Sequence, residues 1–132
     1  MKIVVRLGLV AALSLGALVS LPVTAGAACE LTEFDVKIVK HIWHNRCSKK
    51  NCAELKGAAM VTSRCDEPVA VQVRLTALDE SGAEVEKMER WPWDLRSVSA
   101  GEQGFSINHW IKYDENVRDF KIQVIGVKAA GQ

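Results

Sequence analysis

The sequence predicts an all-β fold, an antiparallel β-sandwich of six or seven strands. Short segments in which apolar and polar side chains alternate recur every 8–12 residues or so. Clusters of turn-forming residues, such as Asp79–Gly82 and Ser97–Gly101, separate these segments. Beyond the N-terminal segment no apolar repeat of helical period lasts more than two turns, and Pro92 stops the one candidate helical turn.

The first two strands are expected to pair as a hairpin. In Phe34–Trp43 the apolar residues fall at 34, 36, 38 and 42, a period of two that Lys40 interrupts. Leu55–Cys65 is the predicted returning strand, with three small residues from Gly57 onward near its start. Antiparallel pairing then places Phe34 opposite about residue 64.

Val69–Leu78 has the clearest strand pattern. Its apolar side chains should share one face, and the polar ones between them should share the other. After the turn at Asp79–Gly82, Ala83–Arg90 is expected to return as a polar edge strand. A short strand follows at Gly104–Asn108. The last strand is predicted at Val117–Lys128, with one face formed by Phe120, Ile122, Val124 and Gly126.

The first 27 residues have the layout of a secretory signal peptide. Lys2 and Arg6 precede an uncharged apolar run of about 17 residues, and small residues follow it, including the A-x-A site Ala25–Ala27. We therefore expect a single β-sandwich domain at 28–132, exported to the periplasm or secreted. A lipoprotein anchored at Cys29 is the alternative, but a branched apolar residue normally stands where Gly26 is.

The charge balance gives no reason to expect a nucleic-acid partner. The chain has 17 basic and 16 acidic side chains, so it is nearly neutral. Once the signal is removed, no second apolar run is long enough to span a membrane. No G-x-S-x-G, H-E-x-x-H or phosphate-binding loop is present. We expect a protein that is not an enzyme and needs no cofactor.

The four cysteines are expected to form two structural disulfides. In the predicted hairpin, Cys29 and Cys65 lie at one end, and Cys47 and Cys52 lie in the loop at the other end. The nested pairing Cys29–Cys65 and Cys47–Cys52 meets the distance that a disulfide needs, whereas crossed pairing would join opposite ends of the ribbon.

A metal site is the sharper alternative for the same region. His41 and His44 could combine with Cys47 and Cys52 as ligands for copper or zinc. An odd separation on a strand directs the two imidazoles to opposite faces, which argues against this reading. We therefore expect no metal, with a carrier of copper or zinc through His41 and His44 as the alternative function.

Several residues resemble a known family of sandwich domains. They are the run Val71–Asp79, then Gly82 and Val85, then Ala100–Glu102 with Phe105, and finally Phe120–Val124. This pattern resembles the immunoglobulin-like, extracytoplasmic bacterial domains of the FxLYD kind. The chain departs from it where Leu78 replaces the family's Tyr and Ala100 its Pro. The resemblance implies an immunoglobulin-like fold and no particular activity.

Four tryptophans against one tyrosine are the most unusual feature of the composition. In Trp91-Pro92-Trp93 the proline holds two large rings on a stiff, extended segment. With Trp110 these residues are the candidate binding set, because exposed aromatic rings anchor protein interfaces and stack on sugars. We expect a module that binds another envelope or secreted protein, through this segment or an exposed sheet edge. Carbohydrate binding is a further alternative, as is a structural role in capping the sandwich.

Overall fold

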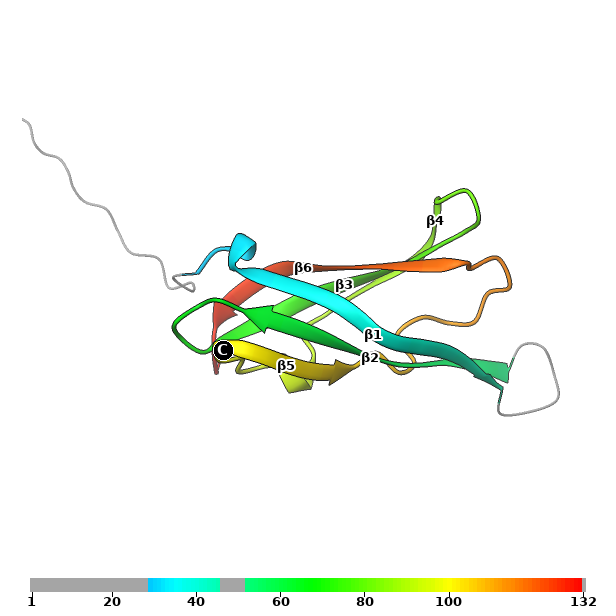
Figure 1. The fold of residues 1–132 in the computed structure, drawn as a ribbon. Helices are drawn as coiled ribbons and strands as arrows, with labels where there is room; N and C mark the ends of the chain where they lie inside the picture. Colours follow the sequence, from blue (N-terminus) through cyan, green and yellow to red (C-terminus); the bar gives the residue numbers. More distant parts are fainter. Residues whose placement is uncertain (1–28, 46–51, 132) are drawn as a thin grey trace, which may run out of the picture.

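Six strands form two antiparallel sheets in the computed structural model, which describes residues 29–45 and 52–131 (Figure 1). One sheet has the order β1–β2–β5, with bounds Phe34–Asn45, Ala53–Ser63 and Gly101–Ser106. The other has the order β4–β3–β6, with bounds Glu84–Arg90, Val69–Leu78 and Asp119–Ala129. The predicted β-sandwich is confirmed. Two 3₁₀ turns, η2 (Leu31–Glu33) and η4 (Trp93–Leu95), precede β1 and follow β4.

The core lies between the two sheets and is built mainly from β2 and β3. All five alternating apolar residues of β3 are almost fully buried, as the sequence pattern predicts. They meet Leu55 and Val61 of β2, together with residues from the segments that follow η4 and β5. Each buried Val or Leu side chain among them stabilises the fold by about 1.5–3 kcal/mol relative to an exposed position.

The β1–β2 hairpin has nearly the predicted register, since Phe34 pairs with Ser63. Its apolar face was predicted wrongly at one residue. A bulge between Ile38 and Lys40 leaves Val39 unpaired and shifts the alternation by one position. Ile42 therefore lies on the outer face of the sheet and is 60 % exposed, while Trp43 takes the inward position.

The face predicted for β6 was wrong at Gly126, because a second bulge interrupts this strand. Its register with β3 skips Ile125, so Gly126 pairs with Gln72 and Val127 with the buried Val71. Phe120, Ile122 and Val124 face the core as predicted, but Gly126 faces outward. Gly126, which is half-buried, leaves space for the Trp91 ring of the candidate site described below.

The short strand β5 begins earlier than the predicted Gly104–Asn108. Gly101 starts it with φ 112°, a conformation that favours glycine, and Ser106 ends it. Asn108 leaves the strand, and its side chain accepts a hydrogen bond of 2.7 Å from the Gly57 backbone N–H. Within the predicted turn Ser97–Gly101, Val98 is buried and exchanges backbone hydrogen bonds with Val69.

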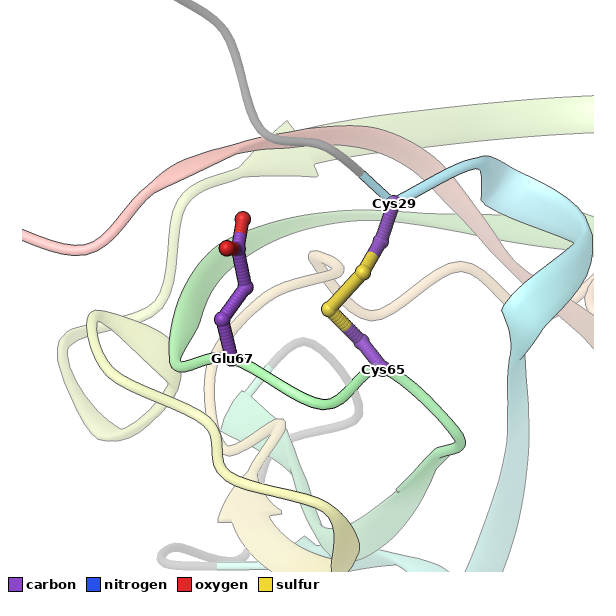
Figure 2. Close-up of side chains that lie close together, drawn as sticks. All are labelled: Cys29, Cys65 and Glu67. Atoms are coloured by element: carbon purple, nitrogen blue, oxygen red, sulfur yellow. A yellow bond between two sulfur atoms is a disulfide. The ribbon is translucent and has the colours of Figure 1, made fainter.

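The Cys29–Cys65 disulfide is present, as the hairpin geometry predicts. Its Cα atoms lie 5.8 Å apart, and it ties the chain before η2 to the loop after β2 (Figure 2). Because such bonds persist in oxidising compartments, it indicates an extracytoplasmic environment. Cys52 is also disulfide-bonded, and its predicted partner Cys47 lies outside the described residues, as does the predicted signal peptide. No helix in the described part of the chain is long and apolar enough to cross a membrane.

Candidate binding site

Trp91 lies on the outer face of the β4–β3–β6 sheet. It follows Arg90, which pairs with the inward-facing Val73, so strand alternation directs the next side chain outward. Its indole reaches across β3 to β6, where a Cβ on Gly126 would stand only 3.3 Å from its Cη2 atom. The Lys128 ammonium lies 4.3 Å from the centre of the Trp91 ring, a cation–π contact.

Trp93 begins η4 and projects into solvent, with 75 % of its surface exposed. Pro92 precedes it with φ −63°, and the fully buried Leu95 anchors the same turn to the core. The Arg96 guanidinium stacks 3.8 Å from the centre of the Trp93 ring, and its Nη1 donates a 2.9 Å hydrogen bond to the Trp93 carbonyl. The exposed indole is therefore held by its own turn.

The two indoles border a shallow cavity of about 350 Å³, named here the Trp cavity. Ala70 borders it from β3; its side chain faces outward, yet it is only 3 % exposed. Arg96 and Lys128 bring two cations to the same cavity. A second hollow of about 420 Å³ lies on the other side of the segment, toward Ser106 and Trp110.

Trp110, the fourth member of the candidate set, is 6 % exposed and belongs to the core cluster. Its ring centre lies 6.0 Å from that of Phe105, and the Arg90 guanidinium lies 5.6 Å from the ring centre. Little of its surface is open to a ligand, so the site is built on Trp91, Pro92 and Trp93.

The two candidate metal ligands of β1 lie on opposite faces of the strand. His41 pairs with Gly57 and turns toward the second sheet, where its ring meets Phe120 edge-on at 5.0 Å between centres. His44 pairs with Glu54 and projects to the outer face. The two imidazoles therefore do not converge on one site.

A potential ligand group lies instead at the other end of the hairpin. Within residues 29–45 and 52–131, the ligand atoms of Cys29, Cys65 and Glu67 lie within 4.8 Å of one another (Figure 2). Both sulfur atoms are joined in the disulfide and so cannot act as thiolate ligands. In this oxidised form the two cysteines form a structural cross-link rather than a metal centre.

The two cations of the Trp cavity are functional candidates that the sequence did not reveal. Arg96 stands three residues after Trp93, which places the two side chains on one face of a 3₁₀ turn, but the turn itself was not predicted. Lys128 reaches Trp91 across a neighbouring strand, and only the sheet order brings them together.

No family model, no curated protein and no solved structure matches this chain.

Proposed function

We propose that this chain is an extracytoplasmic, non-enzymatic binding module that recognises another protein of the envelope through Trp91-Pro92-Trp93. The observation that supports this most strongly is the 75 % exposure of Trp93 on a braced turn. A large indole left in water gains from burial against a partner, and tryptophan and arginine are enriched where binding energy concentrates.

The bracing of the segment also favours binding. Pro92 restricts the backbone, Leu95 is buried, and Arg96 stacks on the Trp93 ring. A surface that is ordered before binding loses less conformational entropy when a partner docks. The segment therefore offers a rigid aromatic anchor at low entropic cost.

An exposed sheet edge is the second element of this proposal. Among the described strands β5 pairs only with β2, so one of its edges has no strand beside it. Such an edge can accept an extended peptide through main-chain hydrogen bonds. The hollow that Trp93 shares with Ser106 lies next to it, so a partner strand could meet the indole.

The proposal includes export by a signal peptide at 1–27 and a periplasmic or secreted location. A lipid thioether at Cys29 and the Cys29–Cys65 disulfide exclude each other, because both need the same sulfur atom. The resemblance to FxLYD domains fits this location and the sandwich fold, and we retain that kinship as part of the proposal.

The test compares three forms of the purified protein on a solid support: wild type, Trp93→Ala and Ile42→Ala. Ile42 is the matched control, since it is an exposed apolar residue of the other sheet. Each form is incubated with envelope extract, and the captured proteins are quantified by mass spectrometry. The captured protein that is most enriched on wild type is then purified and titrated against each form.

We expect a partner that wild type and Ile42→Ala capture equally and that Trp93→Ala loses by about tenfold or more. Equal capture by all three forms would refute the proposed surface. A glycan array provides the contrasting result: binding to a sugar that Trp93→Ala abolishes would replace the protein partner by a carbohydrate. Metal uptake in calorimetry that is lost when His41 and His44 are both replaced would favour the carrier instead.

A further inference from the structure

The Trp cavity combines apolar walls with two positive charges, and this combination indicates what it binds. Trp91, Pro92 and Trp93 provide flat apolar surface, and Arg96 and Lys128 provide the charge. The remaining described lining residues, Ala70, Leu95 and Gly131, add no side-chain hydrogen-bonding group. The cavity therefore presents apolar surface and cationic donors, and its side chains offer no acceptor.

Neither cation is neutralised by the rest of the described chain. Arg96 and Lys128 form no ion pair with a carboxylate there, whereas Arg64 and Arg74 each pair with one. Their contacts are with the indole faces, at 3.8 Å for Arg96 and 4.3 Å for Lys128. Nη1 of Arg96 donates one hydrogen bond to the Trp93 carbonyl. Stacking leaves the other N–H groups along the guanidinium edge available, and such groups bind carboxylates.

The size of the cavity suits a ligand no larger than a single residue. Its volume of about 350 Å³ is at the lower end of the 300–1,000 Å³ or so that is usual for small-molecule sites. One amino-acid residue can bring both an apolar side chain and a carboxylate only when it is the last residue of its chain. An oligosaccharide needs more room, and its hydroxyl groups need acceptors that these side chains do not offer.

We infer that the Trp cavity binds the C-terminal residue of a partner protein, an apolar residue whose α-carboxylate meets Arg96 and Lys128. This inference rests on the proposed function, since it specifies which part of the partner the Trp91-Pro92-Trp93 segment recognises. The ring or aliphatic side chain lies between the indoles. The α-carboxylate accepts hydrogen bonds from the guanidinium edge and the ammonium group.

The test uses N-acetyl-phenylalanine, which carries an apolar ring beside a carboxylate, and N-acetyl-phenylalanine amide, which lacks only the charge. Each is titrated into the oxidised protein while the indole Nε1–H signals of Trp91 and Trp93 are followed by NMR. The variants Arg96→Gln and Lys128→Gln each remove one cation. Lys121→Gln is the matched control, an exposed lysine on the outward face of the same strand β6.

We expect the acid to cause saturable shifts of both indole signals. The amide should bind wild type at least about tenfold more weakly than the acid does, and each cavity variant should bind the acid at least about tenfold more weakly than wild type does. Lys121→Gln should bind like wild type. Equal binding of acid and amide, or no shift at all, would overturn the inference. Shifts with glucuronate but not with N-acetyl-phenylalanine would overturn it in favour of an acidic sugar.

These outcomes are separable from failure of the proposed function. If a partner is still captured through Trp93 while neither probe distinguishes the carboxylate, only the C-terminal ligand is refuted. If capture does not depend on Trp93, the proposed surface itself is refuted, whatever the probes show.

Discussion

Replacing Trp91 and Trp93 one at a time by Ala should destabilise the protein very unequally. Trp91 is 41 % exposed and packs against Gly126 and Lys128, whereas Trp93 is 75 % exposed. A fully buried tryptophan removes up to about 250 Å² from water. The exposures then leave about 150 Å² of buried surface for Trp91 and about 60 Å² for Trp93.

At about 25 cal/mol per Å², these areas correspond to upper estimates of about 4 kcal/mol for Trp91 and about 1.5 kcal/mol for Trp93. The cation–π contact of each ring adds about 0.5–1 kcal/mol to both and leaves the difference unchanged. Trp91→Ala should therefore cost about 2 kcal/mol more free energy of unfolding than Trp93→Ala. For a domain of this size that difference lowers the Tm by about 10 °C.

Urea unfolding of the oxidised protein measures both values, with far-UV circular dichroism as the probe because it does not depend on the tryptophans. Lys128→Gln is the matched control for Trp91, since it removes the cation and keeps the ring; it should cost about 0.5–1 kcal/mol. If Trp93→Ala proved as destabilising as Trp91→Ala, the exposed indole would be structural. The assignment of Trp91 to stability and of Trp93 to binding would then be wrong.

Three further predictions concern the scaffold. Replacing Cys29 and Cys65 by Ser, or reducing their bond, should lower the free energy of unfolding by about 4 kcal/mol, because the disulfide closes a loop of 36 residues. A decrease of less than about 1 kcal/mol, measured by urea unfolding, would contradict this. Gly126→Val should lower the free energy of unfolding by about 1–3 kcal/mol and move the indole above it, since a Cβ there would stand 2.6 Å from the side-chain oxygen Oε1 of Gln72, 3.1 Å from Gln72 Cβ and 3.3 Å from Trp91 Cη2; unchanged stability and indole NMR signals would contradict it. The Ser81 hydroxyl, then backbone N–H groups, hold the pKa of Asp79 below 3.8, so its contribution to stability is present above that pH and is lost as the pH falls further. Asp79→Ala should therefore be less stable than wild type at pH 7 and approach it in acid, and a gap independent of pH would refute the role of the carboxylate.

Alternation and turn chemistry were enough to predict most of the fold. Val69–Leu78 has the bounds and the buried face that its sequence predicts, because five apolar residues in strict alternation allow only one orientation on a two-layer core. The hairpin register followed from antiparallel geometry, and it brought Cys29 and Cys65 together.

The two bulges could not be predicted in the same way. An extra residue at Val39 or Ile125 inverts every side chain beyond it, yet neither residue differs in type from a regular strand residue. This is why Ile42 and Gly126 were assigned to the wrong face. The Trp cavity depends on the second bulge, since it turns Gly126 and Lys128 outward beneath Trp91.

The candidate site was therefore predictable only in part. Trp91-Pro92-Trp93 stood out in the sequence because proline between two large rings is unusual. The cations that complete the site come from a turn contact and from a strand more than 30 residues away, and only the folded sheet brings them together.

Photo-crosslinking in living cells shows directly whether Trp93 contacts a partner protein. A benzophenone amino acid is placed at Trp93 in one strain and at Ile42 in another, the cells are irradiated, and adducts are resolved by mass. We expect one discrete protein adduct from position 93 and none from position 42. The same adducts from both positions, or none from either, would contradict it.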